Sequence, residues 1–561
     1  MPLPRFSEMP YSRPSIDETR DEYSELYRRW DSAETLGEQT EVIAQWNARR
    51  VGRETLQNLA MVRFQLDTSC SERRAEQVFF DAEDPTFKTL QLDFLKRVLG
   101  SAYRVGLEAH FGAHAFALWE RFVASFDPCI ADEKREEAAR VTRYSELLAS
   151  IEIPFQGRTE NLSSIRGFYG HADRSIRLEA YQKADAAFAA HQEELDQLFE
   201  ELVACRHTMA EKMGRSSFVS LGYEQLYRTD YDASDVDAFR QQVRELVVPL
   251  ATKIRERRAN ELGLEDYGLH DELLRDKQGV PKPNGDHDWM LERASEMFSE
   301  MGEDFERFFR MMQEKELLDL KSRTGKAGGG FCVPLDRYDV PFIFANFNGT
   351  QDDVLVFTHE CGHAFQTWSC RPQPVSDYHF PTYEAAEIHS MGLEMLTHPQ
   401  MHRFFGDDAD RFVMSHLEGA ILFIPYGTLV DHFQHWVYEN PGSGSEERAA
   451  AWKRLEAIYL PHRRYEDMPH FASGRFWQRQ MHIYSNPFYY IDYCLALTCA
   501  LQFWEQAERD RSETMKRYRA LCVKGGSESF LNLVDEAGLK SPFKPAALKA
   551  ACEAVAKAIG I

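Results

Sequence analysis

Hydrophobic residues recur at helical spacing along most of the chain. Residues 17–50, 131–150 and 174–214 place apolar side chains three or four positions apart and charged side chains between them. The first of these segments opens on one apolar stripe, formed by Ile16, Tyr23, Leu26, Tyr27 and Trp30. A stripe of this kind buries one face of a helix and leaves the charged face in water. The pattern therefore predicts a mainly helical protein.

Two segments interrupt the helical pattern. Residues 275–288, RDKQGVPKPNGDHD, contain two prolines and two glycines among charged residues, which predicts an exposed loop. Residues 324–330, TGKAGGG, predict a flexible turn. A phosphate-binding loop is not expected there, because the spacing and the final Gly-Lys-Ser/Thr of that motif are absent.

The clearest strand pattern is FCVPLDRYDVPFIFANFNGT, residues 331–350, which ends at Asn-Gly. It comes directly before a helix that we predict over 353–368. An edge strand in that position can pair with an extended peptide, although a hairpin buried in the core fits the pattern equally well. We therefore expect one small β-sheet beside this helix.

Composition and charge narrow the class of protein. The 561 residues are 43% hydrophobic, which is enough for a large core. The net charge of −24 repels phosphate backbones, so we expect no nucleic-acid partner. The N-terminal segment lacks a basic start followed by an apolar run, and uninterrupted apolar stretches such as 419–430 are shorter than the about 20 residues of a membrane span. Since the ten cysteines are irregularly spaced, we expect a reduced, cytoplasmic protein without a membrane partner.

The sequence VFTHECGHAFQTW, residues 356–368, contains His-Glu-x-x-His. His359 and His363 are four residues apart, so their imidazoles project from one face of the predicted helix and can reach one tetrahedral zinc ion. Glu360 lies beside them, where it can take the proton of a water that the metal activates. The surrounding positions are apolar, and a buried His-Glu-His cluster without an ion would leave polar groups unpaired. The motif therefore predicts a catalytic zinc site.

A catalytic zinc ion needs a third protein ligand and an open fourth position. One familiar continuation places Gly three residues and His six residues after the second histidine, but those positions hold Gln366 and Ser369. The other continuation places a glutamate on a later helix, and a helix is predicted over 382–397.

That second helix offers several possible ligands. Glu384, Glu387 and Glu394 follow one another at helical spacing, and three carboxylates on a largely apolar helix are hard to explain as a solvated face. Physical reasoning alone leaves Glu384 and Glu387 equally suitable. His389 points elsewhere on the helix and is less suitable.

These motifs resemble the thimet oligopeptidase / oligoendopeptidase F family of zinc peptidases, and most closely its bacterial branch of oligoendopeptidase F and Pz-peptidase. In that family, a ligand glutamate follows the two-histidine helix by about two dozen residues, and another glutamate comes seven residues later. HECGH followed by EIHSMGLE, residues 387–394, fits both intervals. The resemblance implies Glu387 as the third zinc ligand and Glu394 as a carboxylate that orients a ligand histidine.

A second resemblance lies in RQMHIYSNPFYYIDYCLAL, which includes the Tyr-rich segment 482–493. Taken alone, these tyrosines fit an aromatic core. In the family, a histidine and tyrosines face the zinc ion across the cleft, where they can stabilise the oxyanion that forms when water attacks a peptide carbonyl. The resemblance assigns that role to His482 and Tyr493, and it implies Tyr489 or Tyr490 as a further substrate contact.

The resemblance also implies the architecture and the activity. We expect an elongated, clam-like helical fold in which a deep central channel has one zinc ion per chain on its floor. Residues 1–170 would form an N-terminal helical region in the channel wall, and residues 171–561 the catalytic region. The expected activity is that of a zinc-dependent oligoendopeptidase that cleaves internal bonds of short unstructured peptides, as a monomer or small homo-oligomer.

Three alternatives to this activity stay open. The first is a zinc carboxypeptidase of related helical fold. The second is a metal-containing peptide-binding protein without catalysis, which the intact Glu360 argues against. The third is a helical scaffold in which the motif arose by chance.

Overall fold

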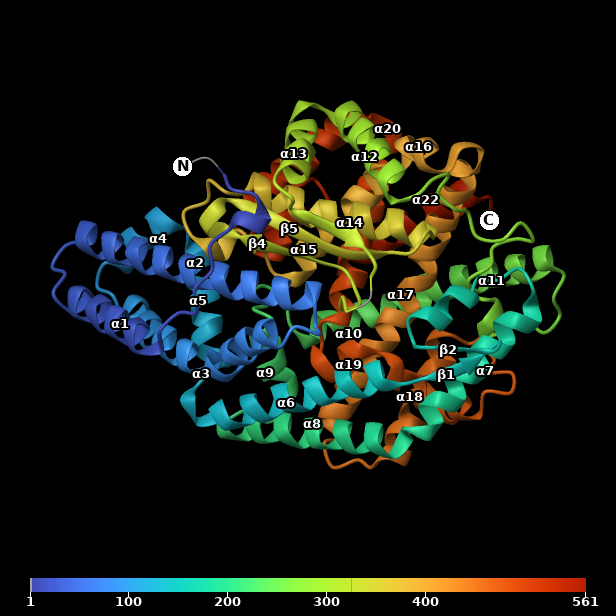
Figure 1. Cartoon of the computed structure of the whole chain (residues 1–561), viewed down its shortest axis with the longest axis horizontal. Helices are drawn as coiled ribbons and strands as arrows, with labels where there is room; N and C mark the ends of the chain where they lie inside the picture. Colours follow the sequence, from blue (N-terminus) through green and yellow to red (C-terminus); the bar gives the residue numbers. More distant parts are fainter. Residues whose placement is uncertain (1–2, 324) are drawn as a thin grey trace.

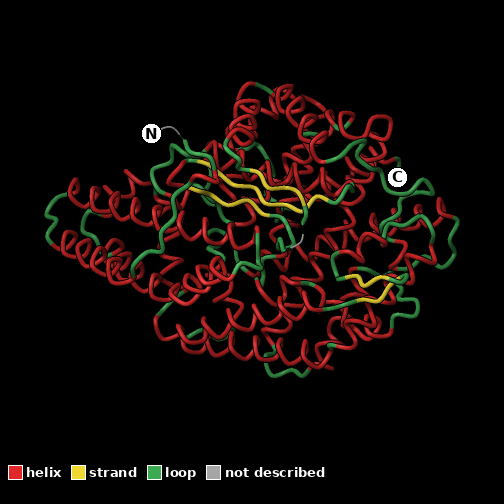
Figure 2. The backbone as a smooth tube through the Cα atoms, in the orientation of Figure 1, coloured by secondary structure: helices red, strands yellow, loops and turns green. Residues whose placement is uncertain are grey.

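The computed structural model describes residues 3–323 and 325–561. Figure 1 shows an elongated molecule built mostly of helices, and Figure 2 shows the strands as two small groups among them. One large cluster of buried apolar side chains extends from Phe6 to Ile559. The mainly helical class predicted from the sequence is confirmed.

The N-terminal helices are α1 (Ile16–Asp31), α2 (Leu36–Leu66), α3 (Ser71–Leu99), α4 (Arg104–Phe111), α5 (Ala113–Ser125) and α6 (Ala131–Ser150). Of these, α1 to α5, drawn in blue, form one end of the molecule in Figure 1, and α6, drawn in cyan, runs beside α8 (Gln192–Lys212). The predicted segment 17–50 is divided between α1 and α2, because Thr35 starts a new helix. Its hydroxyl accepts a hydrogen bond from the Glu38 N–H (3.3 Å), and the Glu38 carboxylate accepts one from the Thr35 N–H (3.0 Å). This reciprocal pair satisfies donors that a helix start leaves free.

The next helices are α7 (Arg174–Ala190), α8 (Gln192–Lys212), α9 (Phe218–Gln225), α10 (Ala233–Gln242), α11 (Val248–Leu262), α12 (His287–Met301) and α13 (Glu303–Glu314). Among them, α8 runs along the side of the molecule opposite α13 in Figure 1. The chain then crosses the middle of the molecule through α9 and α10 and reaches α12 and α13. The predicted segment 174–214 is thus two helices that meet at His191. The predicted loop 275–288 is irregular up to the start of α12.

The small sheet lies directly before the motif helix, as expected. It has the strand order β3-β5-β4, formed by β3 (Leu318–Lys321), β4 (Phe331–Leu335) and β5 (Val340–Phe347). β4 pairs with β5 in antiparallel register, Phe331 opposite Phe344, so β4 is an edge strand. The sequence did not predict β3, nor a separate hairpin of β1 (Ile153–Phe155) and β2 (Arg158–Glu160). Within the predicted turn 324–330, Thr324 lies outside the described residues.

Three helices bring the candidate site together. α14 (Gln351–Ser369) and α15 (Tyr383–Leu396) correspond to the predicted helices 353–368 and 382–397, and α15 packs against both α14 and α20 (Tyr490–Lys524). Gly362 allows the close crossing of α14 and α15. A Cβ at this position would lie 2.5 Å from the carbonyl oxygen of His389 and 2.6 Å from Cα of Ser390. Since both are backbone atoms, a side chain at 362 would push the helices apart.

The other helices of the C-terminal half surround this group. They are α16 (His402–Phe405), α17 (Ala409–Glu439), α18 (Ser445–Tyr459), α19 (Met481–Ser485), α21 (Phe530–Glu536) and α22 (Pro545–Ile559). One stretch, His398–Glu439, is long and apolar enough to cross a membrane, judged by length and composition alone. The sequence predicted no such stretch, because the uninterrupted apolar runs within it are short. Of its most apolar window, 56% is buried inside the protein, as is common for the core helix of a folded domain.

Candidate metal centre and channel

Three side chains meet between α14 and α15. Glu387 Oε2 lies 3.2 Å from His359 Nε2 and 3.5 Å from His363 Nε2. Zinc bonds of about 2.0–2.1 Å at tetrahedral angles place neighbouring donor atoms about 3.3–3.4 Å apart. The two imidazole nitrogens and the carboxylate oxygen therefore fit a zinc ion and leave a fourth position for another ligand.

The structure distinguishes between Glu384 and Glu387, which the sequence left equally suitable as the third metal ligand. Glu384 is buried within electrostatic reach of Asp492 of α20, and burial together with the Asp492 charge raises the pKa of Glu384. Arg228 lies 2.7 Å from Asp492 and is the cation in this buried group. His389 is also away from the cluster, because its Nδ1 bonds to the Ala385 carbonyl (2.8 Å). Of the two glutamates that the sequence left equally suitable, Glu387 is the one whose carboxylate lies beside both histidines.

A series of hydrogen-bonded side chains supports His359 through its Nδ1 atom, the ring nitrogen that does not face Glu387. Its Nδ1 lies 2.7 Å from Glu394 Oε1, the contact that the resemblance implied. Glu394 Oε2 lies 3.0 Å from His416 Nε2, and His416 Nδ1 lies 2.9 Å from His398 Nε2. Burial alone would raise the pKa of Glu394, but the hydrogen bonds to His359 and His416 hold it at about 2. His416 and His398 could not be predicted from the sequence, because nothing in their local pattern marks them as neighbours of α15.

Two hydroxyl groups fix the carboxylate of Glu387. Tyr489 donates to Oε1 (2.6 Å), and Ser390 donates to Oε2 (2.8 Å). The resemblance implies a substrate contact for Tyr489 or Tyr490, whereas the Tyr489 hydroxyl contacts a candidate metal ligand. This leaves Oε2 facing the histidines.

Glu360 is buried beside the two histidines. Burial raises the pKa of its carboxyl group, while the charges of His359 and His363 lower it. Among the described residues, Glu360 Oε2 has no hydrogen-bond partner. A Cβ on Gly330 would lie 3.5 Å from the other oxygen, Oε1, so the backbone leading into edge strand β4 passes next to this carboxylate.

His482 and the three tyrosines of the Tyr-rich segment form one group. The ring of His482 has its centroid 4.9 Å from that of Tyr490, 5.6 Å from that of Tyr489 and 5.8 Å from that of Tyr493. Burial raises the pKa of the Tyr493 hydroxyl, so this residue keeps its proton at neutral pH. The structure thus brings together side chains from α19 and α20 that the sequence associated only by resemblance.

Two residues that the sequence analysis missed orient His482. The Tyr426 hydroxyl donates to Gln480 Oε1 (2.9 Å), and Gln480 Nε2 donates to His482 Nδ1 (2.9 Å). An Nδ1 atom that accepts a hydrogen bond carries no proton, so the proton of the neutral ring is on Nε2. Burial lowers the pKa of His482 to about 4, which keeps the ring neutral. His482 therefore presents an N–H donor.

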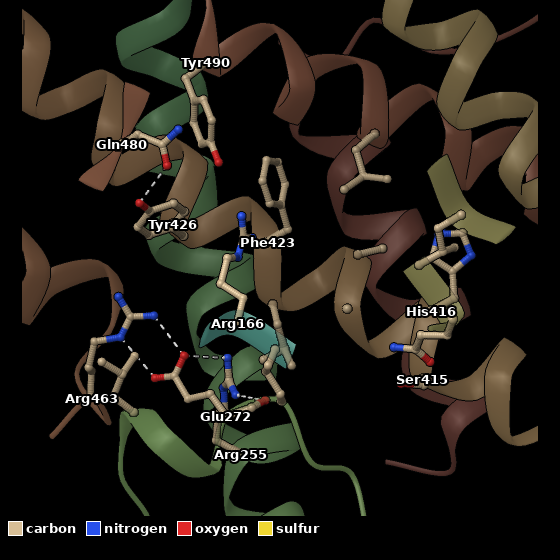
Figure 3. A pocket seen from close by; sticks show the side chains of 18 of the residues that line it. Arg166, Arg255, Glu272, Ser415, His416, Phe423, Tyr426, Arg463, Gln480 and Tyr490 are labelled. Carbon is tan, nitrogen blue, oxygen red and sulfur yellow. Dashed lines mark hydrogen bonds and ion pairs between the residues drawn. The ribbon is translucent and has the colours of Figure 1, made fainter. Parts of the chain in front are cut away.

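Cavities lie on both sides of the metal centre. A cavity of about 780 Å³ is lined by Met391 and Glu394 from the second half of α15, together with His482 and Tyr490 (Figure 3). At the other end of α15, two cavities of about 410 Å³ each are lined by Tyr383. Glu387 lies between these two ends, as expected for a metal centre on the floor of a channel.

Comparison with known proteins identifies the family. Residues 6–126 match the peptidase M3 N-terminal domain, and residues 169–553 match peptidase family M3. The chain is 24% identical to the group B oligopeptidase PepB of Streptococcus agalactiae over 386 residues, which are 66% of this chain and 60% of PepB. It is 23% identical to an oligoendopeptidase F homolog of Lactococcus lactis over 52% of this chain and 48% of that protein. The matched regions thus span between about half and three fifths of these relatives.

Solved structures are similar over almost the whole chain. A crystal structure described as oligoendopeptidase F has 41% identity and a TM-score of 0.97, with 99% of both chains covered. Pz peptidase A, solved with an inhibitor, has 38% identity and a TM-score of 0.97, also with 99% of both chains covered. A protein of Bacillus anthracis described as oligoendopeptidase F has 39% identity and a TM-score of 0.92, with 99% of this chain and 98% of that chain covered. Sequence and fold agree with the resemblance inferred from the motifs, and the chain belongs to peptidase family M3.

Proposed function

We propose that this protein is a zinc-dependent oligoendopeptidase that hydrolyses internal bonds of short, unstructured peptides. The observation that carries the proposal is a cluster of three donor atoms, in which Glu387 Oε2 lies 3.2 Å and 3.5 Å from the two histidine nitrogens, with a carboxylate oxygen of Glu360 beside them that has no partner among the described residues. The cavities at both ends of α15 support an internal cleavage site, because a peptide can extend past Glu387 in both directions. The names of PepB and Pz peptidase A support peptides as the substrate class.

The proposed mechanism assigns a step to each group of residues. His359, His363 and Glu387 would hold one zinc ion, which when bound supplies Lewis-acid polarisation of a water molecule and of the scissile carbonyl. Glu360 accepts the proton of the water at Oε2 and then gives it to the leaving amine, first as base and then as acid. Glu394 keeps the His359 ring oriented through its hydrogen bond to Nδ1.

Donors on the opposite side of the centre stabilise the charge that develops on the substrate. His482 donates through Nε2–H, and Tyr493 donates through its hydroxyl, to the oxyanion of the attacked carbonyl. Tyr490 lines the large cavity and contacts the substrate beside that position. Tyr489 holds the Glu387 carboxylate, a role that its hydrogen bond favours over direct contact with substrate.

The surroundings of the centre select extended peptides. An extended chain would pair with edge strand β4, whose approach passes Glu360, and thereby align its carbonyl with the site. The N-terminal region contributes one wall of the channel, since Arg50 of α2 and Trp119 of α5 line a cavity together with Tyr383.

All ten cysteines are free thiols in the structure, which supports a reducing, cytoplasmic location. We propose a monomer or small homo-oligomer.

One assay tests the metal, the endopeptidase activity and the size limit together. Peptides of increasing length, each blocked at its C-terminus, are incubated with the protein with and without a chelator, and the products are identified by mass spectrometry. We expect internal cleavage that the chelator abolishes and that added zinc restores. Release of residues only from peptides with a free C-terminus would identify a carboxypeptidase instead. Binding of peptides without any hydrolysis by the zinc-loaded protein would overturn the proposal.

A further inference from the structure

The large cavity is positively charged, although the protein as a whole carries a net charge of −24. Its charged lining consists of five arginines and two glutamates: Arg166, Arg255, Arg258, Arg463, Arg479, Glu272 and Glu394. A concave surface lined by one sign of charge concentrates ligands of the opposite sign. The cavity therefore attracts anionic groups.

Three of the five arginines are paired with carboxylates of the protein itself. Glu272 lies 3.3 Å from Arg255 and 2.8 Å from Arg463, a network that Figure 3 shows at the base of the cavity. Arg258 lies 2.7 Å from Glu418. These ion pairs hold the three guanidinium groups in place.

Arg166 and Arg479 differ from these three arginines in their ion pairing. Within the described parts of the chain, neither guanidinium group has a carboxylate oxygen within 4.0 Å. In Figure 3, Arg166 points into the cavity toward Tyr426 and Phe423, and no interaction is drawn to it. The guanidinium of Arg479 lies 4.6 Å from the ring centroid of Phe476, a stacking contact that orients it without using its N–H donors. Two arginines thus have donors available for a ligand.

The two arginines act on the same part of the cavity. Burial raises the pKa of Tyr426, and the positive charges of Arg479, Arg463 and Arg166 lower it. Burial likewise raises the pKa of Tyr169, and Arg479 and Arg166 are the charges that lower it. Tyr426 also bonds to Gln480, which orients His482. Arg166 and Arg479 therefore both act on Tyr426 and Tyr169, and both line the cavity that His482 and Glu394 also line.

We propose that Arg166 and Arg479 bind a carboxylate of the peptide substrate in this branch of the channel. The carboxylate is either the α-carboxylate at the C-terminus or an aspartate or glutamate side chain. A guanidinium group fits a carboxylate by two parallel hydrogen bonds, and a pair of them repels the ammonium group of the peptide N-terminus. The subsite thereby sets the direction in which a peptide enters. This inference rests on the proposed peptidase function and adds a substrate preference to it.

Four versions of one cleavable peptide test the proposal. They carry either a free C-terminal carboxylate or a carboxamide, and either glutamate or glutamine near that end. For the wild-type protein we expect kcat/KM to be about tenfold higher for a peptide with the carboxylate that is recognised, mainly through a lower KM. The free-acid/amide pair and the Glu/Gln pair show which of the two carboxylates it is. In Arg166→Gln, Arg479→Gln and their combination, we expect this ratio to fall toward one, while Arg479→Lys restores part of it.

A matched control comes from the opposite end of the channel. Arg53 lines the cavity beside Tyr383, and Arg53→Gln removes the same charge there. We expect this variant to keep the carboxylate preference of the wild-type protein. Equal kcat/KM for all four peptides in the wild-type protein would overturn the proposal, as would a preference that Arg53→Gln reduces as much as Arg166→Gln does.

Direct binding separates this inference from the proposed function. Fluorescein-labelled versions of the four peptides are titrated with the wild-type protein and with the arginine variants, and anisotropy reports Kd without any turnover. A carboxylate preference in Kd that is lost in the arginine variants supports the subsite even if no peptide is cleaved. Peptide cleavage without any carboxylate preference in Kd or KM supports the peptidase and rejects the subsite.

Discussion

The orientation of His482 by Gln480 leads to a prediction about the pH dependence of the reaction. Gln480 donates to His482 Nδ1 over 2.9 Å, which places the ring proton on Nε2. In Gln480→Glu, a carboxylate replaces the amide donor and accepts a hydrogen bond from Nδ1–H instead. A neutral ring then carries its only proton on Nδ1, and Nε2 can no longer donate to an oxyanion.

The size of the effect follows from the charge state of the ring. Burial lowers the pKa of His482 to about 4 in the wild-type protein, and an adjacent carboxylate raises such a pKa by about 1–3 units, to roughly 5–7. Below the new pKa the ring is doubly protonated and keeps its Nε2 donor. Above it the donor is lost, and loss of one oxyanion donor lowers kcat by about 10²–10³. The kcat of Gln480→Glu, divided by that of the wild-type protein, should therefore fall as the pH rises.

The control for this variant is Gln480→Met, which removes the hydrogen bond without adding charge. Loss of one hydrogen bond of about 1–1.5 kcal/mol corresponds to a decrease in kcat of about tenfold, and we expect it to be the same at every pH. The assay is steady-state cleavage of one peptide between about pH 5.5 and about pH 8.5, with zinc content measured for each variant. A flat ratio for Gln480→Glu, or full kcat in Gln480→Met, would refute the assigned orientation of His482.

Four further predictions concern the metal centre and its supports. Glu360→Gln should retain zinc but lose about a thousandfold in kcat, and activity near that of the wild type would remove Glu360 from the mechanism. Glu387→Ala should lose zinc by metal analysis, whereas full occupancy would point to another ligand. Gly362→Ala should weaken zinc binding at least about tenfold in a chelator competition, because the added Cβ would meet the backbone of α15. The control is Gly52→Ala, where an added Cβ meets nothing within 4 Å. Burial and the neighbouring Asp492 charge raise the pKa of Glu384 above its ordinary value of 4.5, so the folded protein holds a proton that the unfolded chain releases. Stability therefore falls as the pH rises above that value, by up to about 1.4 kcal/mol per pH unit while the folded protein keeps this proton. Glu384→Gln should flatten this decline in urea unfolding, and an unchanged slope would contradict the pKa.

The metal site shows how far local sequence determines structure. The spacing of His359 and His363 fixes their relative direction as soon as α14 forms, because four residues are close to one helical turn. The same local logic places Glu360 beside them and predicts the helices, which follow from apolar residues three and four positions apart. For this reason the sequence alone predicted the helical class, the motif helix and its chemistry.

The third ligand required tertiary structure. Glu384 and Glu387 are one helical turn apart, and their local patterns are equivalent. Packing of α15 between α14 and α20 directs Glu387 to the histidines and places Glu384 within electrostatic reach of Asp492. The family resemblance anticipated this choice, but the physical cause is the position of two neighbouring helices, which no local pattern encodes.

The residues around the site depend even more on the fold. His416 and Arg166 belong to segments far from α14 in the sequence, and they reach the site only when those segments pack together. Gln480 is two residues from His482, but the Tyr426 hydroxyl that holds it comes from the distant helix α17. The sequence by itself determined which residues can bind a metal ion and move a proton. The tertiary structure decided which of them meet and which charges in the channel remain free, because burial and pairing are properties of the packed chain.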